Sequence, residues 1–203
     1  ALHSLFVIMG AKAEFNGFCL TPCAGLVRRQ IFARLNGEHS TLSLGGLSLL
    51  RGKEHADTTL VVDHAVPNCV SREFFRHILD DEATGVFQGK IVVRQHAQKT
   101  DGGMKSQTLV LGEEASMNNK PELEIFADDV VCGHGATVGQ LDQNQIFYLR
   151  ARGLSRGEAE SLLLEAFANE ALELVADEAV RARFKLQSDA WLSARHGASG
   201  SAA

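Results

Sequence analysis

The sequence predicts a mainly β fold followed by a C-terminal α-helical segment. Short apolar segments separated by Gly, Asn and Asp fill the greater part of the chain, and apolar residues recur at helical spacing after about residue 150. We therefore assign residues 1–148 to a β core, residues 149–192 to a helical segment and residues 193–203 to a flexible tail.

The apolar segments of the β core are short, and several alternate with polar residues. Leu42 and Leu44 share one face of an extended segment, as do Leu123 and Ile125. This pattern fits a sandwich, a barrel or a β-helix, and the scarcity of two-residue hairpin turns favours a solenoid. The predicted segments are 5–9, 25–35, 42–50, 58–62, 86–93, 109–111 and 123–126. Residues 71–79 instead predict a helix that begins at a Ser71 cap.

The helical segment opens with a capping box, in which Ser155 is the cap and Glu158 follows three residues later. Apolar residues then recur at helical spacing and predict one long helix or two consecutive helices up to about residue 192. The members of this stripe include Ala159, Leu162, Leu163, Ala166 and Phe167. From the pattern alone, we favour packing on the chain's own core over docking of a partner.

Composition excludes several classes of protein. The 203 residues are 45% hydrophobic and 22% charged, which is typical of a globular fold, and the net charge of −5 does not favour nucleic acid. No apolar run approaches the length that spans a bilayer. The apolar residues 5–9 have neither a basic region before them nor a clear small-residue cleavage site after them, which disfavours a signal peptide, so we expect a cytoplasmic protein. The chain lacks an initial Met and starts within a predicted strand, so we also expect that an N-terminal part is missing.

The four cysteines do not form a disulfide framework, and we expect a reducing compartment. Cys19 and Cys23 could form half of a metal site, but no second pair follows at zinc-finger spacing, which favours buried or idle thiols. Cys69 and Cys132 complete the set.

The residues best suited to chemistry are Cys132 and His134. On an extended backbone, positions two apart lie on one face, so the thiol and the imidazole can converge on a metal ion or an iron–sulfur unit. Taken alone, this pair is more simply a buried Cys beside a surface His, because four ligands are usual in a closed site. A nucleophilic Cys132 with His134, His64 or His77 as its base is a further alternative, although no hydrolase signature surrounds it.

The sequence gives less support to two other kinds of chemistry, ATP binding and catalysis by carboxylates. The sequence has neither a phosphate-binding loop nor a dinucleotide fingerprint, so it does not predict ATP binding by this chain. A β-helix enzyme that acts on a sugar or acyl group would need reactive carboxylates such as Asp128 or Asp129. Nothing in the sequence arranges these two residues as a general acid and base.

Six runs of the chain, in order and without large gaps, resemble the SufB/SufD family of iron–sulfur assembly proteins. These runs are residues 62–73, 85–93, 98–101, 119–130, 132–139 and 145–153, and the resemblance extends over about residues 30 to 190. The Cys-Gly-His-Gly-Ala-Thr run at 132–137 is similar to the SufD type, since SufB-type proteins carry a Glu-His version there.

The resemblance implies a right-handed parallel β-helix core followed by helices. It also implies a non-catalytic scaffold that pairs with a SufB-type paralogue and docks a SufC-type ABC ATPase. Cys132 and His134 would then contribute to a transient iron–sulfur cluster at the subunit interface. The ATPase-docking residues would be Leu162, Leu163, Ala166 and Phe167.

Two further expectations concern a cofactor and self-association. The family is linked to a reduced flavin, for which the sequence shows no site. A homodimer of the isolated chain through the uncovered end of the solenoid is also expected, because unpaired strand edges invite pairing.

Overall fold

The computed structural model describes residues 1–22 and 25–199, in which ten β-strands precede three α-helices. The strands are β1 Leu2–Met9, β2 Glu14–Thr21, β3 Leu26–Leu35, β4 Thr41–Leu50, β5 His55–His64, β6 Val70–Leu79, β7 Thr84–Val93, β8 Asp101–Val110, β9 Ser116–Ile125 and β10 Val131–Gly139. The helices are α1 Gln143–Arg150, α2 Arg156–Leu172 and α3 Glu178–Ser199.

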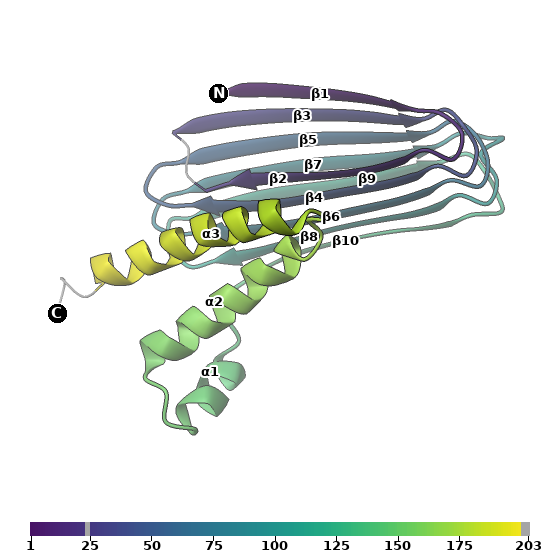
Figure 1. Ribbon diagram of the computed structural model, residues 1–203. Helices are drawn as coiled ribbons and strands as arrows, with labels where there is room; N and C mark the ends of the chain where they lie inside the picture. Colours follow the sequence, from purple (N-terminus) through teal and green to yellow (C-terminus); the bar gives the residue numbers. More distant parts are fainter. Residues whose placement is uncertain (23–24, 200–203) are drawn as a thin grey trace.

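Successive strands alternate between two parallel sheets, which together form a β-solenoid (Figure 1). The odd-numbered strands form the sheet β1-β3-β5-β7-β9, and the even-numbered strands form β10-β8-β6-β4-β2. Each coil therefore contributes one strand to each sheet. This architecture confirms the predicted parallel β-helix core followed by C-terminal helices.

The length of one coil varies slightly along the solenoid. Thr41 pairs with Val70, one coil of 29 residues later, whereas Val70 pairs with Asp101 after a coil of 31 residues. The extra residues lie in the turns, because the ladders themselves remain in register. A strict repeat was therefore not visible in the sequence.

The turns after the odd-numbered strands repeat their backbone geometry without repeating their sequence. Lys12, His39, Asn68 and Lys99 occupy equivalent turns and have φ angles of 58°, 61°, 59° and 61°. This left-handed conformation is uncommon for residues other than glycine, although Asn tolerates it. Backbone bonds between successive turns, such as Asn68 N–H to the Gln98 carbonyl at 3.0 Å, hold the stack together.

The helices cover only the sheet of even-numbered strands (Figure 1). The C-terminal half of α2 and the helix α3 pack Leu164, Leu172 and Trp191 against Leu47 and Ile78 of this sheet. In contrast, α1 and the N-terminal half of α2 project away from the solenoid. We call this projecting part, residues 143–163, the arm.

The helix predicted for residues 71–79 is wrong, because these residues belong to strand β6. Alternate side chains of β6 point inward and are buried, but three of them are polar: Ser71, Glu73 and His77. The outward positions include Phe74, which is only partly exposed, so the alternation of apolar and polar residues is hidden. Every second side chain of β6 points inward and is buried, but polar and apolar residues do not alternate along its sequence.

The helical part also differs from its predicted limits. Helix α1 begins at Gln143, within the range assigned to the β core, and Asp142 caps it by accepting the Asn144 N–H. Two helices, α2 and α3, follow, which agrees with the predicted alternative of two consecutive helices. Helix α3 continues to Ser199 and thus includes residues assigned to a flexible tail. An Arg195–Asp80 ion pair at 2.5 Å joins α3 to the turn after β6. Residues 200–203 lie outside the described residues.

Candidate functional site

Strand β10 forms the edge of its sheet at the C-terminal end of the solenoid (Figure 1). Cys132 pairs in register with Gly102 of β8, and His134 pairs with Met104. Residues paired in a parallel ladder point to the same face, and Gly102 and Met104 face the interior. Cys132 and His134 therefore lie side by side over the interior, at an end where the described residues place no further strand.

The Cys132 thiol is half-buried and packs against the core. Gly102 beneath it has no side chain, and a β-carbon built there would lie 3.5 Å from Cys132 Sγ. Burial raises the pKa of the Cys132 thiol, opposed by a hydrogen bond from the Gly102 backbone, and the Asp101 and Glu73 carboxylates raise it further. The raised pKa favours the protonated form of the thiol near neutral pH.

His134 is exposed, whereas the other two histidines considered as bases are buried. His64 bonds the Ser71 hydroxyl through Nε2 at 3.0 Å, and burial lowers the pKa of His64 to about 4. Burial also lowers the pKa of His77 to about 4. Both rings are neutral near pH 7 and lie within the solenoid core, which favours structural roles for them.

A buried carboxyl group beneath β10 was missed by the sequence analysis. Glu73 lies in register with Met104 and is only 1% exposed. Burial raises the pKa of Glu73 to about 8, against the lowering effects of the Ser71 hydroxyl and of Arg72. Its i, i+2 relation to Ser71 and Phe75 was the available signal, but the predicted helix obscured it.

The four predicted docking residues do not share one surface. Leu162 is 46% exposed and Ala166 is exposed, while Leu163 is half-buried and Phe167 packs toward the sheet. The residues of α2 that are actually buried are Ala159, Leu164, Ala168, Ala171 and Leu172. The predicted capping box is present, with Ser155 Oγ accepting the Glu158 N–H at 3.3 Å.

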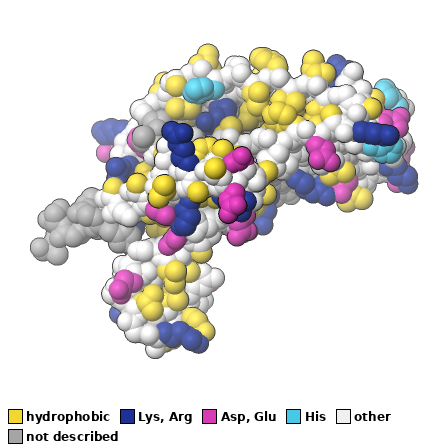
Figure 2. Space-filling model, in the orientation of Figure 1, with side chains coloured by type: hydrophobic (Ala, Val, Ile, Leu, Met, Phe, Trp, Pro, Cys, Tyr) yellow, Lys and Arg dark blue, Asp and Glu magenta, His cyan; other side chains and the backbone are white. Residues whose placement is uncertain are grey.

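The arm exposes apolar and basic side chains together (Figure 2). Phe147 is 74% exposed and Tyr148 is 56% exposed. Arg152 stacks its guanidinium over the Tyr148 ring, 4.3 Å from the centroid. Exposed aromatic residues beside arginine are typical of protein–protein interfaces.

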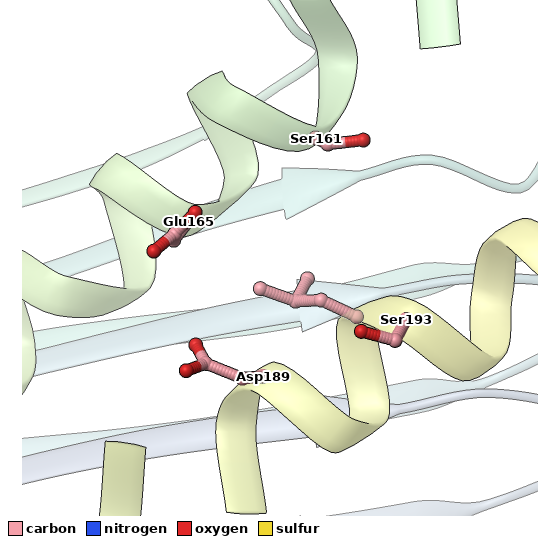
Figure 3. A pocket seen from close by; sticks show the side chains of 5 residues that line it. Ser161, Glu165, Asp189 and Ser193 are labelled. Atoms are coloured by element: carbon pink, nitrogen blue, oxygen red, sulfur yellow. The ribbon is translucent and has the colours of Figure 1, made fainter. Parts of the chain in front are cut away.

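A pocket of about 420 Å³ lies between α2 and α3 (Figure 3). Glu165 of α2 and Asp189 of α3 face each other across it, and Ser161 and Ser193 complete its polar lining. Lys185 Nζ bonds both carboxylates, at 2.9 Å to Glu165 and 3.0 Å to Asp189. These ion pairs join the two helices, so the pocket is best explained as their junction.

The remaining candidates form no further site. Cys69 is fully buried and its sulfur lies 3.3 Å from Ser40 Oγ, and Cys19 is half-buried, while Cys23 falls outside the described residues. Asp129 is exposed and pairs with Lys99. Within residues 1–22 and 25–199, no group of three or more His, Cys, Asp or Glu side chains could hold a metal ion. None of the described helices is long and apolar enough to cross a bilayer.

The family model for the SufBD core domain of the SUF system for FeS cluster assembly matches residues 1–167. This match covers all ten described strands, helix α1 and helix α2 as far as Phe167. The chain belongs to the SufB/SufD family.

Individual relatives agree with this assignment. The iron-sulfur cluster assembly protein SufD of Escherichia coli (strain K12) is 43% identical over 181 residues, which cover 89% of this chain and 42% of the relative. An iron-sulfur cluster assembly SufBD family protein of Synechocystis sp. is 40% identical over 181 residues, covering 88% and 40%. The chloroplastic protein ABCI7 of Arabidopsis thaliana is 29% identical over 179 residues, covering 87% and 37%.

These matches confirm the resemblance to the SufB/SufD family and its SufD type. The chain spans about two fifths of the length of the curated relatives that it matches. The roles of Cys132, His134 and the docking residues stay predictions.

Proposed function

We propose that this chain belongs to a non-catalytic scaffold subunit for iron–sulfur cluster assembly. In this proposal, it pairs with a SufB-type paralogue at the open end of the solenoid and docks a SufC-type ATPase on the arm. The observation that carries the proposal is the uncovered strand β10, which presents Cys132 and His134 together at the edge of a sheet.

The chemistry of β10 supports this role. A thiolate and an imidazole are suitable ligands for iron–sulfur units, but two ligands leave the coordination incomplete. A partner strand that pairs with β10 would bring its own ligands to the same edge and cover the exposed backbone groups. A shared cluster explains why the described residues of this chain hold no complete metal site.

The arm supports docking of a partner through its exposed aromatic and apolar residues. Phe147, Tyr148 and Leu162 would form the apolar part of the contact, and Arg152 would add a positive charge. Phe167 belongs to the internal packing of α2 and is not part of this proposed contact.

Capture of the SufC-type ATPase from the same source tests the arm. We expect the wild type to retain the ATPase and Leu162→Asp to lose it, because a charge placed in an apolar contact must be desolvated. Leu186→Asp is a matched control, since Leu186 is 71% exposed on α3, outside the arm. Equal capture by both variants, when both are folded, would contradict the proposed docking surface.

Cluster reconstitution in the complete complex tests the role of the thiol. We expect Cys132→Ala to leave the complex assembled and to reduce the cluster yield at least severalfold, because one ligand is lost. Cys19→Ala is the control, since Cys19 is a half-buried thiol on β2, the edge strand at the opposite end of the same sheet. An unchanged yield in Cys132→Ala would show that Cys132 is not a ligand.

A further inference from the structure

A buried arginine joins the helix that carries the arm to the sheet that carries the candidate site. Arg76 lies on the outward face of β6, beneath α2, and its side chain is only 6% exposed. Burial lowers the pKa of Arg76, and the neighbouring Glu170 raises it. A buried cation costs free energy unless its surroundings compensate for the lost water, so its contacts need an explanation.

On the helix side, Arg76 makes three kinds of contact with α2. Its Nη1 donates to the Phe167 carbonyl at 2.6 Å, and its Nη2 donates to Glu170 at 2.5 Å. The guanidinium also lies over the Phe167 ring, 4.2 Å from its centroid, and Phe74 of β6 itself lies 5.0 Å away. These contacts fix both the position and the rotation of α2, because the guanidinium is planar and its donors have fixed directions.

On the sheet side, Arg76 reaches toward the candidate site. Its Nη2 donates to Gln107 Oε1 on β8 at 3.0 Å. Gln107 is in register with Arg76 on one side and with Thr137 of β10 on the other. The contacts of Arg76 thus extend from α2 to the strand next to the one that carries Cys132 and His134.

An apolar cluster also joins α2 to the sheet. Leu164, Ala168 and Leu172 pack against Leu47 and Leu49, and such contacts are strong but non-directional. They can hold α2 on the sheet without fixing the direction in which the arm projects. Arg76 adds directional contacts to this interface.

We propose that Arg76 is a positioning residue that fixes the orientation of the arm relative to the strand carrying Cys132 and His134. This inference gains its functional meaning from the proposed function, in which the arm holds the ATPase and β10 holds the cluster. The orientation itself is a property of the chain alone and can be measured without a partner.

The test is the distance between two spin labels, one on the arm at Arg150→Cys and one on the solenoid at Lys120→Cys, both exposed positions. Cys19, Cys23 and Cys132 are replaced by Ser, and the fully buried Cys69 is retained. We expect a single narrow distance distribution without further changes and at least a twofold broader one in Arg76→Gln. A narrow distribution with an unchanged mean in folded Arg76→Gln would overturn the proposal.

Two further variants keep the test decisive. If Arg76→Gln does not fold, the double variant Gln107→Leu with Glu170→Ala removes one hydrogen-bond acceptor on each side while keeping the arginine, and the same broadening is expected. A narrow distribution in that variant would overturn the proposal. Arg195→Gln is the matched control, because Arg195 ties α3, rather than α2, to Asp80, and the distribution should stay narrow.

Two different measurements test the role of Arg76 and the proposed function, so that one can fail without the other. Loss of ATPase capture in Leu162→Asp concerns the docking surface, whereas the distance distribution concerns only Arg76. In the assembled complex, we expect Arg76→Lys to retain ATPase capture and to reduce the cluster yield at least twofold. A lysine keeps the charge but cannot bond Phe167, Glu170 and Gln107 with the same geometry.

Discussion

Strands β4 and β6 are neighbours in one sheet, pair in register and bury the same inward positions, but their interiors differ in chemistry. Leu42 and Leu44 of β4 lie beside Ser71 and Glu73 of β6. Further along the two strands, Ser48 lies beside His77. The inward positions are thus mainly apolar at β4 and more polar at β6, closer to the end that carries Cys132.

This difference shows that the backbone ladder, rather than the interior side chains, defines the shape of a coil. Both strands are ten residues long and have the same register with their neighbours. The polar strand therefore contributes less apolar burial to stability and carries titratable groups that the apolar strand lacks. The comparison predicts effects of opposite sign for changes in the two strands.

The largest change in stability is expected from a substitution in the apolar strand β4. Leu44→Ala should lower the free energy of unfolding by about 2–5 kcal/mol, because Leu44 is fully packed in the core and the change leaves a cavity. Urea denaturation monitored by circular dichroism measures this loss. The exposed Leu186→Ala is the control, and equal losses in the two variants would contradict the assigned packing.

The substitution Glu73→Gln in the polar strand β6 is expected to increase the free energy of unfolding. The folded chain keeps a proton on Glu73 up to about pH 8, which the unfolded chain releases near pH 4.5, so wild-type stability falls as the pH rises between these values. The variant lacks this decline and should be more stable by roughly 1–3 kcal/mol at pH 8, with no such gain below pH 4.5. Denaturation curves at pH 4 and pH 8 decide this, and a gain that does not depend on pH would exclude the buried proton as its cause.

The substitution His77→Leu is expected to have a smaller effect on stability, and this effect grows as the pH falls rather than as it rises. The unfolded histidine takes up a proton near pH 6.5, whereas the buried ring does so only at about pH 4, so the wild type loses stability as the pH falls through this window. The variant should reduce that loss by roughly 1–2 kcal/mol at pH 5. Thermal melts at pH 7 and pH 5 measure the difference, and parallel pH profiles for the two proteins would refute the assignment.

The sequence was most informative where polarity follows burial. In β4, apolar residues occupy the inward positions Leu42 and Leu44, and the strand was predicted correctly. In β6, the same positions hold Ser71 and Glu73, and the strand was mistaken for a helix. The polarity of such residues does not indicate that they are buried, because the groups that enclose them come from other coils.

The candidate site was predictable in part. The sequence singled out Cys132 and His134 and placed them on one face on the condition that the backbone is extended there, and strand β10 meets this condition. The apolar stripe of α2 was less predictable, since Leu162, Leu163 and Leu164 are consecutive and place an apolar residue on several faces of the helix. Arg76 could not be singled out, because its partners Phe167 and Glu170 lie more than 90 positions away in the sequence.

Strand β10 also bears on how this protein must be produced. The strand contains no Asp, Glu, Lys or Arg, and its outer edge is not covered by any other strand in the described part of the chain. Uncharged edge strands without proline are templates for aggregation. We therefore expect that the isolated chain precipitates, and that a strand of the proposed partner, by covering β10, would keep it in solution.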